Sequence, residues 1–152
     1  SIFYLYSNDA YIECSSQSSC QSVTIFSINA TIITLNFTAL SSFQYGLVYI
    51  QQSNQQINTQ CGNELACSDA SFYYNGNGLS VDHYCNAQSS CKGGLISAMP
   101  INNINVVCGD GIQACDYMDI HTPININAMS NINITGITTS THIYSIHGLT
   151  NL

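Results

Sequence analysis

The feature that most constrains this chain is a short cysteine clasp that recurs at a fixed interval. Residues Cys61 to Cys67 are CGNELAC and residues Cys85 to Cys91 are CNAQSSC, so five residues separate the cysteines of each clasp. The first cysteines of the two clasps are 24 residues apart. Self-similarity at a fixed interval of this size is typical of repeat proteins, in which each repeat stacks on the next.

The remainder of the chain follows the same interval. The gap between Cys14 and Cys61 is 47 residues, nearly twice the interval, and the missing clasp falls at FTALSSF (37–43), with Phe in place of both cysteines. A sixth, degenerate clasp spans 132–138. The second clasp position therefore advances by 23 or 24 residues each time, through Cys20, Phe43, Cys67, Cys91, Cys115 and Thr138.

Apolar residues recur in two columns of the same repeat, which predicts a core that runs the length of the chain. The column five residues beyond the second clasp position holds Ile25, Val48, Phe72, Ile96, Ile120 and Ile143. The column four residues before the first clasp position holds Ala10, Ile33, Ile57, Val81, Ile104 and Ala128. Ile2 fits the first column one period earlier, so the chain is expected to enter the pattern within a repeat.

An interval of 23–24 residues is too short for a two-helix repeat and suits one coil, or rung, of a parallel β-helix. The leucine-rich repeat has a similar period, but its Leu-x-x-Leu-x-Leu frame is missing. The sequence therefore predicts an all-β, single-stranded, right-handed parallel β-helix (β-solenoid) of about six rungs, because parallel crossovers are right-handed. We expect a single β-solenoid domain over residues 1–152, with rungs starting near 11, 34, 58, 82, 105 and 129.

The paired cysteines favour disulfides over metal binding. Both cysteines are lost together in the second and sixth rungs, which favours a disulfide within each rung. Stacked cysteines about 4.8 Å apart are also within disulfide reach, so pairing between rungs remains an alternative. Five intervening residues do not match the usual zinc spacing, and no metal or other cofactor is expected. The expected disulfide cysteines are Cys14, Cys20, Cys61, Cys67, Cys85, Cys91, Cys108 and Cys115.

The composition limits the kinds of partner and the cellular location that are expected for the protein. Charged residues make up 6% of the chain, Lys92 is its one basic residue apart from histidines, and the net charge is −7. Nucleic-acid binding needs Lys and Arg to neutralise phosphates, so no nucleic-acid partner is expected. No apolar run is long enough for a membrane span. Paired cysteines favour an oxidising, secreted or extracellular setting. Three sequons predict N-glycans, at Asn29, Asn36 and Asn133.

One column beyond the first apolar column is rich in aromatic residues. Strand alternation places this column on the outer face, so it predicts a contact face for a neighbouring chain or for sugar rings. The alternative is a stack of rings that only rigidifies the sheet, or a column that belongs to the core. The column contains Phe3, Phe26, Tyr49, Tyr73, Ser97, His121 and Tyr144.

Signatures of an enzyme are absent from the sequence. Asp69, Asp82 and Asp116 fall in different columns or rungs, and no Ser/His/Asp or Cys/His grouping stands out. The pair Asp82-His83 is interpreted as solvated. We therefore expect no enzyme and no catalytic residue. The many asparagines are expected to form amide ladders or turns between coils; they are Asn102, Asn103, Asn105, Asn125, Asn127, Asn131 and Asn133.

The clasps CGNELAC and CNAQSSC, with their Ser/Gly/Asn texture, give the chain a resemblance to a known class of repeat. They resemble the cysteine-rich β-helical repeats of large extracellular proteins of protists, including those of flagellar hairs (mastigonemes). The resemblance covers about residues 11–120, and the rungs with Phe37/Phe43 and Ile132/Thr138 depart from it. It implies an extracellular structural role, and no functional residue is carried over from it.

The function expected from these patterns is that of an extracellular structural protein, a glycosylated subunit that self-associates into a filament or cell-surface appendage. Both ends of the sequence continue the strand pattern without a capping helix, which is expected to favour stacking on another copy or a longer parent chain. One alternative is a carbohydrate-binding or adhesion module that uses the aromatic face. A polysaccharide-degrading β-helix enzyme is a further alternative.

Overall fold

The computed structural model describes residues 1–6, 8–27, 30–51, 56–76, 79–99, 103–109, 113–124, 131–136 and 140–147. These residues form thirteen strands and no helix, hence no helix that could span a membrane. One parallel sheet contains β1 (Ile2–Leu5), β3 (Thr24–Ser27), β5 (Leu47–Ile50), β7 (Ser71–Asn75), β9 (Leu95–Met99), β11 (Asp119–Ile124) and β13 (His142–His147). The other contains β2 (Asp9–Cys14), β4 (Ile32–Phe37), β6 (Gln56–Cys61), β8 (Ser80–Cys85), β10 (Asn103–Cys108) and β12 (Asn131–Thr135).

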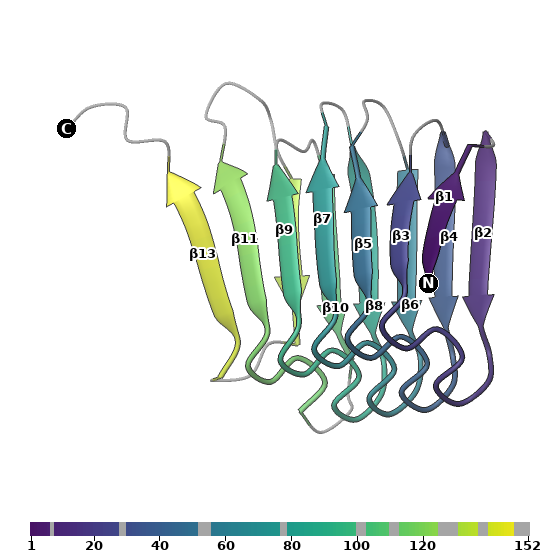
Figure 1. The fold of residues 1–152 in the computed structure, drawn as a ribbon. Helices are drawn as coiled ribbons and strands as arrows, with labels where there is room; N and C mark the ends of the chain where they lie inside the picture. The colour runs from purple at the N-terminus through teal and green to yellow at the C-terminus, as the bar shows by residue number, and fades with distance from the viewer. Residues whose placement is uncertain are drawn as a thin grey trace.

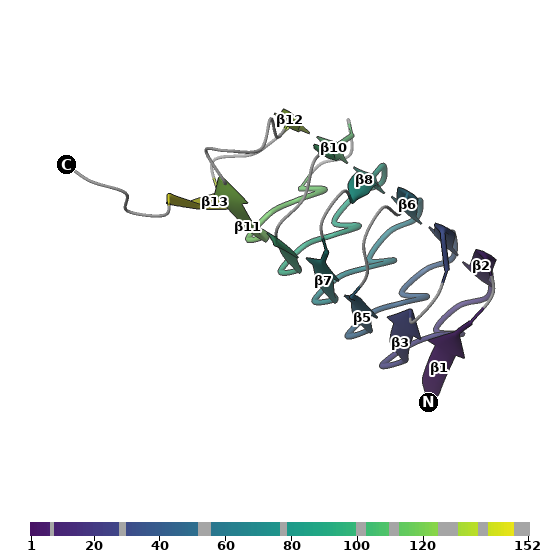
Figure 2. The ribbon, with the colours of Figure 1, turned by 90° about the horizontal axis from the view of Figure 1, so that it is seen from above.

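The chain coils between the two sheets, laying one strand in each sheet per turn. In Figure 1 the strands of the front sheet point up, those of the rear sheet point down, and the clasps at the bottom lead from the rear sheet back to the front, while the coil advances from right to left. That path is a right-handed coil, and Figure 2 shows the two sheets facing each other along its length. The predicted right-handed parallel β-helix is confirmed, and its count of about six rungs differs slightly from the seven and six strands of the two sheets.

The core lies between the sheets, where the two apolar columns meet. In the first sheet, Val48 pairs in register with Ile25 and with Phe72, and in the second Ile57 pairs with Ile33 and with Val81. All six are buried. Alternation along a strand sends every second side chain inward, so each coil adds one layer to the same core.

The first strand departs from the predicted alignment by one residue. Ile2 pairs with Thr24, Phe3 with Ile25 and Tyr4 with Phe26, so the first interval is shorter than the others. Ile2 is 59% exposed and therefore does not extend the buried column as expected. The shift moves Phe3 out of the aromatic column and puts Tyr4 into it.

Disulfides close the clasp corner within single coils, which confirms the favoured pairing. They join Cys14 to Cys20, Cys61 to Cys67, Cys85 to Cys91 and Cys108 to Cys115, with Cα–Cα distances of 5.8–5.9 Å. The free energy that each adds by constraining the unfolded chain is about 2 kcal/mol for so short a loop.

The clasp corner also carries its own backbone ladder. In five coils the residues two before and two after the second clasp position have positive φ, for example Leu65 and Asp69 around Cys67. These left-handed residues turn alternate N–H groups along the axis of the coil. Thus the Cys67 N–H donates to the Ser90 carbonyl (2.7 Å) and the Cys91 N–H donates to the Ala114 carbonyl (2.8 Å). The corner is therefore a third hydrogen-bonded face besides the two sheets.

Candidate functional site

The outer face of the first sheet carries a stack of four aromatic rings, here called the aromatic ladder: Tyr4, Phe26, Tyr49 and Tyr73. Their strands β1, β3, β5 and β7 are neighbours (Figure 1), and their rings are nearly parallel. Ring centroids are 5.5 Å apart for the first pair, 5.2 Å for the second and 4.9 Å for the third. Since these distances match the spacing of strands in a sheet, the backbone itself sets the stack.

The ladder includes three of the seven residues of the column predicted as the contact face. Phe26, Tyr49 and Tyr73 belong to it. The prediction that Phe3 belongs to the column is wrong, because the shift of the first strand puts Tyr4 in that position. Ser97 follows Tyr73 in register on β9 and ends the stack, and His121 follows Ser97 on β11. Tyr144 pairs in register with His121, but its side chain lies outside the described residues.

Two hollows adjoin the ladder. One, of about 280 Å³, is lined by Tyr49, Tyr73, Asn75 and Ser97, with Ile50, Gln51 and Tyr74. The other, of about 470 Å³, is lined by Tyr4, Phe26, Ser27, Tyr49 and Gln51. They share Tyr49 and Gln51, so the surface beside the ladder is hollowed along several coils.

The outer face of the second sheet carries polar side chains instead. The amide of Asn133 donates to Asn105 (2.9 Å), and that of Asn105 donates to Asp82 (3.1 Å), which confirms an amide ladder between coils at two of the predicted asparagines. Asn103 and Asn131 pair in register on the same strands, and Asn102, Asn125 and Asn127 lie outside the described residues.

Two of the three sequon asparagines are on this outer face. Asn133 is exposed, and Asn36 is partly buried, with its amide donating to the Tyr11 hydroxyl (3.3 Å). Asn29 lies outside the described residues. Neither described acceptor is enclosed in the core.

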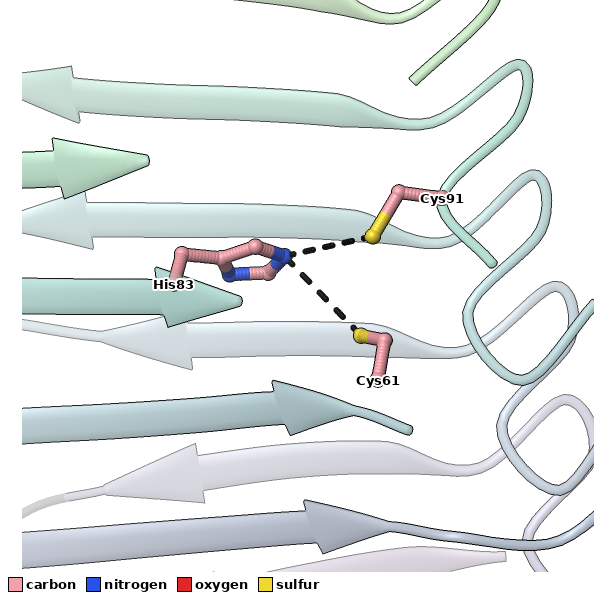
Figure 3. A group of neighbouring side chains, drawn as sticks. All are labelled: Cys61, His83 and Cys91. Atoms are coloured by element: carbon pink, nitrogen blue, oxygen red, sulfur yellow. Dashed lines mark hydrogen bonds between the residues drawn. The ribbon is translucent and has the colours of Figure 1, made fainter. Parts of the chain in front are cut away.

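A chain of polar side chains runs through the core from Thr59 to His83, whose ring lies beside two disulfides. The Thr59 and Tyr74 hydroxyls are 3.1 Å apart, and the Tyr74 hydroxyl is 3.4 Å from Nδ1 of His83. On the other side of its ring, His83 Nε2 lies 3.7 Å from the Cys91 sulfur and 3.9 Å from the Cys61 sulfur (Figure 3). All these residues are buried.

Burial determines the protonation states of His83 and Tyr74. It lowers the pKa of His83 from 6.5 to about 3, because the charged imidazolium would lose its hydration. Burial also raises the pKa of Tyr74, and the hydrogen bond with Thr59 partly opposes this shift. A consistent set of donors has Thr59 donate to Tyr74 and Tyr74 donate to Nδ1, which leaves the His83 proton on Nε2, facing the sulfurs.

The cluster of Cys61, His83 and Cys91 has the residue types of a metal site but a different chemistry. A metal binds cysteine as a thiolate, and both sulfurs are held in disulfides. Interpreting the pair Asp82-His83 as solvated was wrong for the histidine. Alternation on β8 contained the signal, because the inward positions of Val81 and Cys85 require His83 to point inward as well.

Three of the described carboxylates contact side chains of neighbouring coils. Asp82 accepts from Asn105, Asp116 accepts from the Ser140 hydroxyl (2.9 Å), and Asp119 is 3.2 Å from Nδ1 of the exposed His142. Lys92 lies over the Tyr117 ring at the clasp corner, 5.9 Å from its centroid. Each of these charged groups thus serves contacts between coils.

Comparison of the chain with protein-family models, with curated proteins and with solved structures finds no match. The chemistry of the described surface is therefore the ground on which a function is proposed.

Proposed function

We propose that the protein is an extracellular structural protein, a rod-like subunit of a filament or cell-surface appendage. The observation that carries this proposal is that the two sheets and the clasp corner each continue in register from one turn to the next. Aromatic rings stack along one sheet, amides bond along the other, and backbone groups bond along the clasp corner. A rod built in this way resists bending at every coil.

The composition of the surface supports association. With 6% charged residues and one lysine, copies of the chain repel each other weakly compared with ordinary soluble domains, about a quarter of whose residues are charged. Sheet faces with few charges are the surfaces on which sheets pack together. The clasp resemblance to flagellar-hair repeats favours the same kind of role.

Four disulfides, with no free cysteine among the described residues, support a secreted location. The outward placement of Asn133 and Asn36 supports N-glycans on the second sheet. Glycopeptide mass spectrometry of protein from a eukaryotic secretory host tests this part. Unmodified asparagine at both positions would remove glycosylation from the proposal.

Electron microscopy and light scattering of the purified protein test the filament. Rods or fibres are expected, and a monodisperse monomer at high concentration would overturn the proposal. Thr34→Lys with Gln60→Lys adds two charges to the outer face of the second sheet and is expected to weaken lateral association. Gln21→Lys with Gln44→Lys places the same charges at the clasp corner, where that face is not altered, and serves as the matched control.

A further inference from the structure

The aromatic ladder stops at a position where its geometry continues. Tyr73, Ser97 and His121 occupy the same column on three neighbouring strands. One face of the Tyr73 ring is covered by Tyr49, whose centroid is 4.9 Å away. Among the described residues no ring stacks on its opposite face, because the next residue of the column is Ser97. We infer that this gap above Ser97 is a binding site for one pyranose ring of an uncharged glycan.

The gap has the size of one ring. Tyr73 and His121 are two strand steps apart, about 10 Å at about 4.8 Å per step. A ring placed midway would lie about 5 Å from each neighbour, within the range of ring contacts. The hollow of about 280 Å³ adjoins this place, since Tyr73 and Ser97 line it together with residues of β5 and β7 and Gln51. Tyr73 is partly exposed there.

The groups around the gap fit a sugar better than an aromatic side chain. A pyranose ring presents C–H groups on its face and hydroxyls around its edge. Tyr73 offers an apolar face, and the side chains of Gln51, Asn75 and Ser97 offer donors and acceptors beside it. An inserted aromatic side chain would leave those polar groups without partners, which costs free energy.

The negative net charge of the protein disfavours acidic glycans. The net charge is −7, and Lys92, the one lysine, lies over Tyr117 at the clasp corner rather than beside the gap. An acidic sugar would therefore meet repulsion without a cation to pair with. The second hollow, which shares Tyr49 and Gln51 with the first, gives an oligosaccharide room to extend along the ladder.

The inference does not depend on the filament proposal, because a single copy contains the whole site. Isothermal titration with cellohexaose, mannohexaose and laminarihexaose tests it, with hexagalacturonate as the acidic comparison. At least one neutral hexasaccharide is expected to bind. Ser97→Tyr fills the gap by completing the stack, and it is expected to weaken binding by at least about tenfold, the effect of about 1.4 kcal/mol.

Two further variants separate the site from the fold. Ser97→Ala keeps the gap open but removes one hydroxyl beside it, so it is expected to lose less affinity than Ser97→Tyr does. Tyr11→Ala, which removes an exposed tyrosine from the second sheet, is expected to leave binding unchanged. Circular dichroism and thermal unfolding check that each variant is folded.

Three outcomes would overturn the inference: no neutral hexasaccharide binds, Ser97→Tyr binds like the parent, or hexagalacturonate binds best. If Ser97→Tyr instead changes only the association of the protein with itself, the gap belongs to a contact between copies, and the glycan site is refuted.

Discussion

Phe37 and Phe43 stack with their ring centroids 4.1 Å apart at the corner where other coils hold a disulfide. Phe37 pairs in register with Cys14 on one side and with Cys61 on the other. Both rings are fully buried. A covalent clasp and an aromatic pair thus occupy the same place in the coil, so the corner depends on a filled position rather than on a covalent bond.

Replacing both phenylalanines by cysteine tests this equivalence. Phe37→Cys with Phe43→Cys is expected to form a fifth disulfide, because the corner follows the same backbone path as its neighbours. The variant should nevertheless be less stable. A short-loop disulfide adds about 2 kcal/mol, whereas the loss of each buried ring costs about 3 kcal/mol or more. Non-reducing mass spectrometry and urea unfolding measure the two effects. A gain in stability would contradict the estimate.

Gly46 is expected to be coupled to the same aromatic pair. A Cβ at Gly46 would meet the ring of Phe43, while the equivalent position beside the Cys61–Cys67 clasp is Ala70. Gly46→Ala alone should therefore destabilise by about 1–3 kcal/mol through overpacking. In the Phe37→Cys, Phe43→Cys background the same change should cost little. A double-mutant cycle of unfolding free energies measures the coupling, and equal costs in both backgrounds would refute it.

At position 45, glycine is expected to give a more stable protein than alanine, the reverse of the usual order. The φ of Tyr45 is 58° and its side chain is 56% exposed. A Cβ in the left-handed region costs about 1 kcal/mol, and glycine avoids that cost. Tyr45→Gly should therefore be more stable than Tyr45→Ala by about this amount. Thermal unfolding of the two variants gives the comparison, and a more stable alanine variant would show that the corner imposes no strain at this residue.

The sequence predicted the columns well because period and alternation determine them. Apolar residues every 23–24 positions, such as Ile33 and Ile57, have to face the same core when strands stack in register. The clasps were predictable for the same reason, since both cysteines of a pair are lost together where Phe37 and Phe43 replace them. Neither inference needs a three-dimensional detail.

Other features depended on details that periodicity does not contain. The shift at Tyr4 arises from one shorter interval, which the composition of the first strand does not reveal. The polar chain from Thr59 to His83 was missed because polar residues were assigned to the surface, although alternation placed them inward. Positive φ at non-glycine residues such as Leu65 and Tyr45 was also not predicted, since no residue type marks it.

The aromatic ladder is expected to add stability in proportion to the number of stacked neighbours. Tyr49 touches a ring on each side, whereas Tyr73 has one stacked partner. With about 0.5–1.5 kcal/mol for each ring pair, Tyr49→Ala should cost more than Tyr73→Ala. Urea unfolding measures the difference, with Tyr11→Ala as the control on the other sheet. Equal costs would show that the rings do not stabilise one another.

Because of His83, the free energy of unfolding is expected to decrease as the pH falls below 6.5, the ordinary pKa of histidine. The pKa of His83 is about 3 in the folded protein and 6.5 in the unfolded chain, so the unfolded state binds the extra proton in this window. The contribution is fully present above pH 6.5 and is lost as the pH falls toward 3, at about 1.4 kcal/mol per pH unit. Between pH 6.5 and 5, where most carboxylates remain ionised, urea unfolding should lose about 2 kcal/mol.

Two variants test whether His83 causes this dependence of stability on pH. His83→Gln should flatten the dependence between pH 6.5 and 5, because glutamine does not titrate. His142→Gln removes an exposed histidine and should keep the slope of the parent protein. The imidazole NMR signals of His83 provide a reading that needs no variant, since this ring should remain neutral down to pH 4. If His83 instead titrates near its ordinary pKa of 6.5, water reaches the ring between the two disulfides, and the buried polar chain is open to solvent.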